Sequence, residues 1–354
     1  MNWIDHPLYL EDLACVASSI TCWDKLHGKT ILITGATGMI GSCLVDVIMY
    51  KNRTAGLECR VLAIGRNEER AKRRFFQYKQ SELFVFHSLD LNNGVFLDES
   101  AQFVLHAASN THPIAYATDP IGTILTNITG TNNLLSWSVD HGCEQFVFAS
   151  SVEVYGENRG DVEFFDESYL GYIDCNTVRA GYPESKRVGE ALCQAYRSQK
   201  HTHCTIARLS RVYGPTMLEN DSKAIAQFLK NGLAHEDIVL KSDGSQRYSY
   251  TYVADAVQAL LLLLCTGIDG EAYNVADINS DCSLKELALV IATYGNSQLK
   301  FELPSQLEKA GYSKATKAVL SASKLRNIGY SPAYPIQKGV NRTLDILQDT
   351  GFFC

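Results

Sequence analysis

The sequence predicts an α/β protein with a doubly wound parallel β-sheet and a smaller α/β domain attached to it. Two observations support this fold class: short β-branched runs alternate with longer stretches of helical apolar spacing, and the first such run ends in a cluster of glycines. Parallel strands connected by helices place those helices on both faces of the sheet. With 354 residues, the chain is long enough for one or two domains.

The expected strands are compact runs rich in Val, Ile, Leu and Phe, of the kind buried inside a parallel sheet. They cover residues 29–34, 59–64, 84–87, 103–106, 145–149 and 205–209. Helical spacing is expected over residues 40–50, and a short helix near residues 8–18. After Tyr213 the pattern is less regular, with short strands, loops and a helix near residues 253–264, which indicates a smaller domain grafted onto the sheet.

Composition excludes several classes of protein. A net charge of -7 argues against nucleic-acid binding, which needs a basic face, although a local basic pocket for a small anion is compatible with it. The apolar run at residues 259–265 is far shorter than a membrane span and predicts a buried helix. Residues 1–6 have no signal-peptide character, so we expect a cytoplasmic location. The 11 cysteines are scattered without metal-ligand spacing, so we expect buried apolar residues and no metal.

A glycine-rich turn follows the first strand. Gly35 allows a sharp turn, Gly38 allows backbone N–H groups to approach a pyrophosphate, and Gly41 allows close packing of helix on sheet. We therefore expect a nicotinamide dinucleotide held by this turn, with Thr37, Met39 and Ile40 beside the glycines; a plain strand–helix turn is the alternative.

This turn divides the chain into three parts. Residues 1–28 form a lead-in, residues 29–212 are mainly a Rossmann domain that binds NAD(P), and residues 213–354 are mainly a substrate-binding domain. Some segments of the third part are expected to return to the Rossmann domain.

The choice between NAD and NADP depends on the end of the second strand. NAD enzymes usually have an acid there for the ribose 2′-hydroxyl, whereas this chain has Arg66, which suits a 2′-phosphate. We therefore favour NADP, with NAD as the alternative. Arg66 would then be a solvated arginine at the start of a helix, with no contact to the cofactor. Asp90, followed by Leu91, is expected either to contact the adenine or to cap the next helix.

Tyr182 and Lys186 are four residues apart, which places both side chains on one face of a helix. The lysine charge is expected to lower the tyrosine pKa toward neutrality and make Tyr182 a base for a sugar hydroxyl. Ser151 ends the strand that precedes this helix, where its hydroxyl can reach the reacting oxygen.

Together these motifs resemble the extended short-chain dehydrogenase/reductase family, which includes the sugar-nucleotide epimerases and dehydratases. The matching segments are residues 34–41, 106–109, 127 with 130–131, 150–156, 182–186, 213–215 and 252–255. The resemblance implies that Ser151 is the catalytic hydroxyl, Tyr182 the base and Lys186 its partner on the nicotinamide ribose. It also implies that the cofactor is lined by Ala107, Ala108 and Ser109, and that Asn127 supports the substrate side of the site.

Residues 179–190 are most similar to the UDP-glucuronate decarboxylases within this family. The resemblance implies oxidation of the sugar at C4, which makes C5 acidic or weakens the bond to a carboxylate. Glu153 stands where members with C5 chemistry have a carboxylate, and a solvated loop acid is the alternative. The similar segment also places Arg179 among the expected substrate-binding residues.

Three positions depart from the family pattern. Val152 replaces the acid or hydroxyl residue that family members have there. Arg211 replaces the phosphate-contacting Asn, and Arg247 stands one place early, so Tyr248 occupies the usual arginine position. Strand alternation predicts that Arg247 and Tyr248 point to opposite faces. We expect Arg211, Arg247 and Tyr248 on the substrate side, with Arg211 taking over the diphosphate charge.

The leading hypothesis is an NAD(P)-dependent enzyme that acts on a nucleotide-diphosphate sugar through a 4-keto intermediate. Epimerisation, dehydration and decarboxylation are all compatible with this first step. The alternatives are an NADPH-dependent 4-keto sugar-nucleotide reductase and a non-catalytic cofactor-binding protein. The family often forms a homodimer through a four-helix bundle, and the apolar residues suited to it are Val188, Ala191, Leu192 and Ala195.

Overall fold

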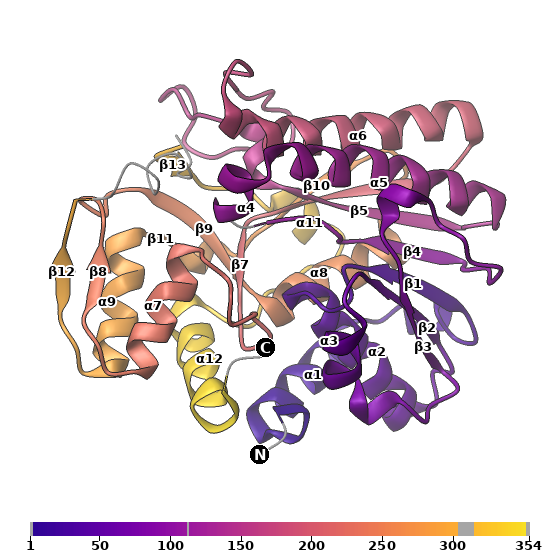
Figure 1. Ribbon diagram of the computed structural model, residues 1–354, viewed down its shortest axis with the longest axis horizontal. Coiled ribbons are helices and arrows are strands. Elements are labelled where there is room, and N and C mark those ends of the chain that lie inside the picture. The colour runs from indigo at the N-terminus through magenta and orange to yellow at the C-terminus, as the bar shows by residue number, and fades with distance from the viewer. Residues whose placement is uncertain (1–2, 112, 304–314, 352–354) are drawn as a thin grey trace.

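Seven parallel strands form the central sheet in the computed structural model, which describes residues 3–111, 113–303 and 315–351 (Figure 1). The spatial order is β10-β6-β5-β4-β1-β2-β3. The strands are β1 Thr30–Thr34, β2 Arg60–Gly65, β3 Phe84–Ser88, β4 Phe103–His106, β5 Gln145–Ser151, β6 Cys204–Leu209 and β10 Ala272–Val275. The first six correspond to the predicted strands, and the doubly wound fold class is confirmed.

The strand order reverses between β1 and β4, which are neighbours in the sheet although β2 and β3 lie between them in the chain. In such sheets a ligand binds outside the carboxyl ends of the strands at this switch point. Ile31, Leu32 and Ile33 of β1 have no solvent exposure, because both faces of the sheet are covered. That burial explains why the strand reads as a continuous apolar run.

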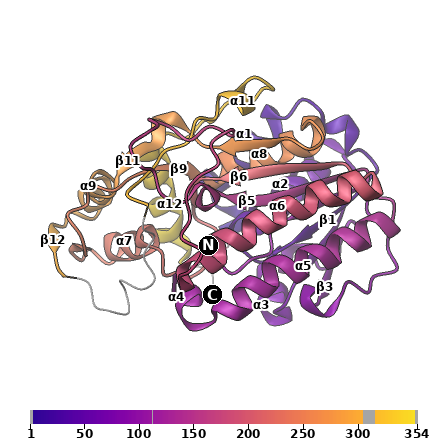
Figure 2. The same ribbon diagram turned by 90° about the horizontal axis from the view of Figure 1, so that it is seen from above.

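Helices cover both faces of the central sheet (Figures 1 and 2). On one face α5 and α6 lie side by side, and on the other α2 packs against α1 and α8. The helices of this part are α1 Pro7–Ser19, α2 Met39–Ala55, α3 Glu68–Arg74, α4 Pro113–Thr118, α5 Pro120–Asp140, α6 Gly181–Lys200 and α8 Val253–Thr266. The lead-in therefore folds onto the sheet layer through α1, which buries Tyr9 and Leu13.

The other elements form a second part at the side of the sheet (Figure 1). In it, β9 pairs with β7, β11 and β13, and β8 pairs with β12. The strands are β7 Arg211–Tyr213, β8 Ile238–Leu240, β9 Arg247–Tyr252, β11 Asp281–Ser283, β12 Leu299–Phe301 and β13 Lys317–Ala318. The helices of this part are α7 Ala224–Leu233, α9 Leu284–Gly295 and α12 Ile336–Thr350, while the short helix α11 Ser323–Arg326 packs against β10 of the central sheet.

Two segments after Tyr213 contribute to the central layer. β10 pairs with β6 at the edge of the sheet, and α8 packs against β5 and β6. Because α8 is covered on all sides, all its residues up to Cys265 are buried. Within the described ranges, no helix combines the length and the apolar character that a membrane crossing requires.

Candidate active site

The glycine turn joins β1 to α2 and packs directly against the end of β4. Gly35 has a φ of +67°, and a Cβ at this position would lie 2.8 Å from the carbonyl oxygen of Ala107. The backbone N–H of Ala108 donates to Thr34 Oγ1 at 3.2 Å, which fixes the two segments together. The structure thus brings the turn and the Ala107–Ala108 segment to the same place, the switch point of the sheet.

The residues of this turn fit a dinucleotide. Gly38 is the N-cap of α2 and no side chain caps the helix, so its first N–H groups face the turn. A Cβ on Gly41 would lie 2.3 Å from the Gly35 carbonyl oxygen, so only glycine allows the close packing of helix against turn. Thr37, Met39 and Ile40 complete the turn and the first residues of α2. Backbone donors at a helix N-terminus are suited to a pyrophosphate.

Arg66 and Asp90 lie beyond the ends of β2 and β3. Arg66 is exposed, and its Nη2 donates to Asn110 Oδ1 at 3.1 Å. Asp90 accepts a hydrogen bond from the Asn92 N–H at 3.0 Å and caps the short 3-10 helix Leu91–Asn93. The capping role expected for Asp90 is therefore present in the structure, and its contact with the adenine stays a prediction.

Ser151, Tyr182 and Lys186 converge at the carboxyl end of β5. Ser151 is the last residue of β5, and Tyr182 and Lys186 lie in the first two turns of α6. The three side chains are buried, and hydrogen bonding from Ser151 lowers the pKa of the Tyr182 hydroxyl. Lys186 Nζ donates to the Ala149 carbonyl at 2.8 Å.

The Tyr182 pKa is raised in the structure, whereas the Tyr182–Lys186 spacing predicts that it is lowered. Burial, reinforced by the negative charge of Glu153, raises the pKa of Tyr182 to about 12. Burial also lowers the pKa of Lys186 to about 8. Loss of hydration therefore exceeds the effect of the lysine, and the groups that lower the Tyr182 pKa are instead Ser151, Arg179 and Tyr116.

Tyr116, on α4, was not found from the sequence. Its ring stacks on that of Tyr182, with centroids 4.7 Å apart and planes 27° apart, and both side chains are buried. The guanidinium of Arg179 lies 4.8 Å from the Tyr116 ring centroid. No spacing motif connects Tyr116 with Tyr182, so only the tertiary fold brings them together.

Glu153 and Arg179 form an ion pair beside Tyr182. Nη2 of Arg179 donates to both carboxylate oxygens of Glu153, each at 2.7 Å. Both residues line a cavity together with Val152, Pro183 and Arg211. The carboxylate expected to act at C5 therefore faces the same space as the groups next to Tyr182.

Arg211 and Tyr248 pack together, whereas Arg247 points elsewhere. The Arg211 guanidinium lies 3.7 Å from the Tyr248 ring centroid, and its buried Nε has no hydrogen-bond partner among the described residues. Tyr248 is buried and donates to the Ala315 carbonyl at 2.9 Å. Arg247 is exposed and pairs with Glu286 at 3.2 Å. The structure thus brings Arg211 to the cavity, with Tyr248 beneath it, and does not bring Arg247 there.

Asn127 and His106 lie behind the reacting groups. Asn127 accepts a hydrogen bond from Ser109 Oγ at 2.8 Å and donates to Ser185 Oγ at 2.9 Å, so its amide bridges the β4 end and α6. The His106 ring contacts Thr34 Oγ1 at 2.7 Å, and burial, followed by the charge of Lys186, lowers its pKa to about 3. His106 and Asn127 therefore support the site from behind, and neither lines the cavity beside Glu153.

A family model for the NAD dependent epimerase/dehydratase family matches residues 31–276. The chain belongs to this family. UDP-glucuronic acid decarboxylase 1 of Xenopus tropicalis is 28% identical over 316 residues, which cover 89% of this chain and 71% of that protein. UDP-glucuronic acid decarboxylase 6 of Arabidopsis thaliana is 32% identical over 234 residues, 66% of this chain and 65% of that protein. The expectation of an NAD-dependent enzyme of this type is confirmed.

Solved structures of epimerases share the fold. The UDP-glucuronic acid 4-epimerase of Bacillus cereus, solved with UDP-glucuronic acid and NAD, superposes with a TM-score of 0.77 at 22% identity, covering 90% of this chain and 99% of that one. Epimerase Mth375 of Methanothermobacter thermautotrophicus gives a TM-score of 0.79 at 21% identity, with 97% of each chain covered.

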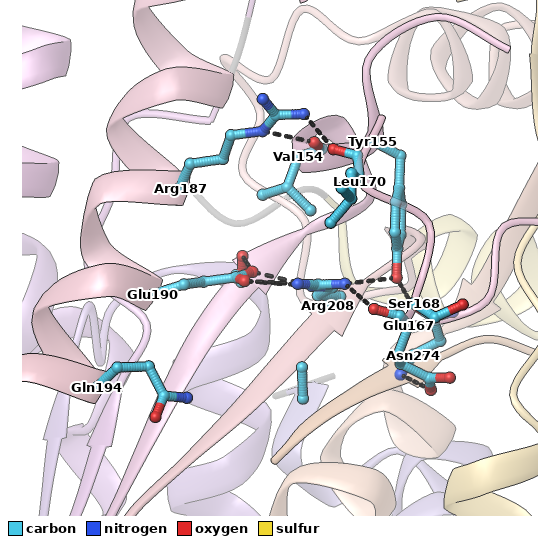
Figure 3. A network of polar contacts seen from close by, with 12 residues as sticks. Val154, Tyr155, Glu167, Ser168, Leu170, Arg187, Glu190, Gln194, Arg208 and Asn274 are labelled. Carbon is cyan, nitrogen blue, oxygen red and sulfur yellow. Dashed lines mark hydrogen bonds and ion pairs between the residues drawn. The ribbon is translucent and has the colours of Figure 1, made fainter. Parts of the chain in front are cut away.

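Behind the site of this epimerase/dehydratase family member, a polar network ties α6 to the neighbouring strands (Figure 3). Glu190 accepts hydrogen bonds from Arg208 Nη2 at 2.7 Å and from Ser150 Oγ at 2.6 Å. Arg208 also donates to the Tyr155 hydroxyl at 2.9 Å and to the Glu167 carbonyl at 3.1 Å. The network therefore fixes α6, the β5 end and the following loop relative to one another, and it positions Ser151 and Lys186.

Proposed function

We propose that this enzyme oxidises C4 of a nucleotide-diphosphate sugar to a 4-keto intermediate and then acts at C5. The observation that carries the proposal is the grouping at the end of β5. Ser151 and Tyr182 are both buried there and hydrogen bonding from Ser151 lowers the Tyr182 pKa, while Glu153, two residues beyond Ser151, lines the adjacent cavity. A hydroxyl–tyrosine pair prepares one oxygen for proton removal, and a separate carboxylate serves the next carbon.

Each side chain has a distinct role in the first step. Tyr182 accepts the proton of the C4 hydroxyl, and Ser151 orients that hydroxyl by hydrogen bonding. When bound at the glycine turn, the dinucleotide supplies the hydride acceptor. Lys186 adds a buried positive charge one turn beyond Tyr182, where the expected contact is the ribose.

The second step is assigned to Glu153. Its carboxylate is paired with Arg179, whose Nη2 lies 2.7 Å from it, and it lines the cavity beside Tyr182. There it can exchange a proton with C5: it would take one in dehydration or C5 epimerisation, and it would return one to C5 after carbon dioxide has left in decarboxylation. Val152 offers neither an acid nor a hydroxyl to expel a leaving group, which disfavours dehydration. Decarboxylation is favoured because the relatives at 26–32% identity are UDP-glucuronic acid decarboxylases.

The test is a panel of nucleotide sugars incubated with the cofactor-loaded enzyme, with products identified by mass. Loss of carbon dioxide indicates decarboxylation, loss of water dehydration, and an unchanged mass epimerisation. We expect turnover without net consumption of reduced cofactor, and its loss in Tyr182→Phe. Stoichiometric consumption of reduced cofactor would instead identify the alternative reductase, and cofactor binding without any turnover would identify a non-catalytic protein.

Arg211 is proposed to bind the diphosphate. It is the cavity arginine without a carboxylate partner in the described part of the chain, whereas Arg179 is already paired with Glu153. Arg211→Ala should weaken substrate binding about ten- to hundred-fold, the usual loss for a charged hydrogen bond. Arg247→Ala is the matched control. It removes an exposed arginine that is paired with Glu286 and does not line the cavity, so it should leave affinity unchanged.

Arg66 is proposed to favour NADP. It is exposed just beyond β2, where a cofactor 2′-phosphate is expected, and no acid occupies that position. Arg66→Ala should weaken NADP binding about ten-fold and leave NAD binding unchanged, whereas Arg73→Ala on α3 should affect neither. Equal loss for both cofactors would refute a role in selection.

A homodimer through α5 and α6 is also proposed. Ile121 and Leu125 on α5 are 71% and 48% exposed, and Val188 on α6, one of the positions expected at the interface, is also exposed. Of the other expected positions, Ala191 and Ala195 are exposed and Leu192 packs partly against the core. Leu125→Asp should shift the protein to monomer in sedimentation, whereas Leu289→Asp on α9, at a similarly exposed leucine, should not.

The proposed cytoplasmic location has support from the cysteines. All ten cysteines in the described part of the chain are free thiols. Six of them lie in helices or strands, and a seventh, Cys59, is buried directly before β2. A protein with this many free thiols suits a reducing compartment. Localisation of the tagged protein in its source cells tests this proposal.

A further inference from the structure

Tyr116 makes three contacts that bear on the base Tyr182. Its ring stacks on the Tyr182 ring with centroids 4.7 Å apart, hydrogen bonding from its hydroxyl lowers the Tyr182 pKa, and the Arg179 guanidinium lies 4.8 Å from its ring centroid. Both tyrosines are 6% exposed, so water cannot substitute freely for these contacts. α4, which carries Tyr116, packs against α5 and against the 3-10 helix Val178–Ala180 that precedes Tyr182.

The direction of the tyrosine–tyrosine hydrogen bond follows from the charges around it. Burial, followed by the negative charges of Tyr182 and Glu153, raises the pKa of Tyr116 well above its usual value. Tyr116 therefore keeps its proton and acts as the donor, while Tyr182 is the acceptor. The same hydrogen bond lowers the pKa of Tyr182.

We propose that Tyr116 is a positioning residue that holds the Tyr182 ring by stacking and donates a hydrogen bond to its phenolate oxygen. A buried phenolate next to Glu153 is costly, because burial removes hydration and the carboxylate repels it. Ser151 offsets part of this cost from the β5 side, and Tyr116 offsets a further part from the α4 side. Arg179 favours both anionic groups, because it pairs with Glu153 and its charge lowers the pKa of Tyr182.

The test is Tyr116→Phe, which keeps the stacked ring and removes only the donor. Ionisation of Tyr182 is measured in the NAD-loaded enzyme as tyrosinate absorbance against pH, with the matching Tyr182→Phe protein subtracted in each background. We expect the Tyr182 pKa to rise by about one unit, the shift for loss of one hydrogen bond to a charged group. The rate of C4 oxidation should fall about ten-fold below that pKa, with substrate KM unchanged.

Two further variants separate positioning from general damage. Tyr116→Leu removes both ring and donor and should raise the Tyr182 pKa at least as much as Tyr116→Phe. Tyr196→Phe, on the same helix as Tyr182, removes a hydroxyl bonded to Asn132 Oδ1 at 3.0 Å and should change nothing. An unchanged Tyr182 pKa in both Tyr116 variants would overturn the proposal.

This inference rests on the proposed function for the role of Tyr182 as base, and the two can fail separately. If no nucleotide sugar is oxidised, the proposed function fails, while the tyrosinate titration still reports the Tyr116 contact. If sugars are oxidised but Tyr116→Phe leaves both the titration and the pH profile unchanged, only the role of Tyr116 is lost.

Discussion

Arg208 is expected to be the residue of the network behind the site whose removal costs most stability. It donates to Glu190 through Nε at 3.0 Å and Nη2 at 2.7 Å, and the side chains of Arg208 and Glu190 are 15% and 12% exposed. Arg208→Met removes these bonds and those to Tyr155 and Glu167. The Glu190 carboxylate then keeps Ser150 as its donor but loses the compensating charge.

The size of the effect follows from this geometry. Breaking a buried ion pair by removing one partner costs about 3–5 kcal/mol, and the slight exposure of this pair places the expected loss at about 3 kcal/mol. The entropy of unfolding of a chain this long is about 0.7 kcal/mol/K, so Tm should fall by about 4 °C.

The assay is urea denaturation, with Arg197→Met as the control. Arg197 pairs with Asp269 at 2.6 Å, but the side chains are 46% and 30% exposed, so its removal should cost at most about 1 kcal/mol. The double variant Arg208→Met/Glu190→Met should recover most of the loss, because no charge is left without a partner. A cost for Arg208→Met equal to that of Arg197→Met, or no recovery in the double variant, would refute this reasoning.

Two other substitutions test the glycine turn and the buried lysine. Gly35→Ala should weaken dinucleotide binding at least about ten-fold, because its Cβ would collide with the Ala107 carbonyl and its φ of +67° disfavours alanine. Gly56→Ala has a similar φ of +59° but open space, so calorimetry should show unchanged cofactor affinity. Lys186→Met should raise the free energy of unfolding at neutral pH by about 3 kcal/mol while abolishing activity, because the cost of burying the ammonium is removed. The folded-state pKa of Lys186 is about 8 against 10.5 for a free lysine. The stability gained by Lys186→Met should therefore be full below pH 8 and vanish as pH rises to 10.5. A pH-independent difference between the two proteins in urea denaturation would contradict this explanation.

The parts of the fold that the sequence predicted are those in which local pattern and burial agree. Five of the six predicted strands, all except the edge strand β3, have a neighbour on each side in the sheet, so each appears as an apolar run. β10, with the sequence Ala-Tyr-Asn-Val, has no such run, and Asn274 within it is buried because its side chain bonds to the carbonyls of Phe165 and Ser321. Pairing with β6 and these hydrogen bonds, rather than hydrophobicity, define this strand.

The site residues also fall into those that a local pattern predicts and those that only the tertiary fold brings together. Ser151, Tyr182, Lys186 and the glycine turn belong to short motifs, so their neighbours in space are also neighbours in sequence or lie on adjacent strands. Alternation along β9 was sufficient to predict that Arg247 and Tyr248 separate. Tyr116 has no local pattern, because its partners lie on another helix.

The reversed pKa shift of Tyr182 shows where reasoning from spacing fails. A four-residue interval places Lys186 on the same face as Tyr182, but it does not determine the position of the ammonium, which donates to the Ala149 carbonyl. Nor does it include Glu153, whose charge acts against ionisation of the phenol. Glu153→Gln should therefore lower the Tyr182 pKa, opposite in sign to the effect of Tyr116→Phe. The carboxylate assigned to the C5 step thus makes the C4 base harder to ionise, and Arg179, which pairs with Glu153, is the residue that lets both groups carry charge in one cavity.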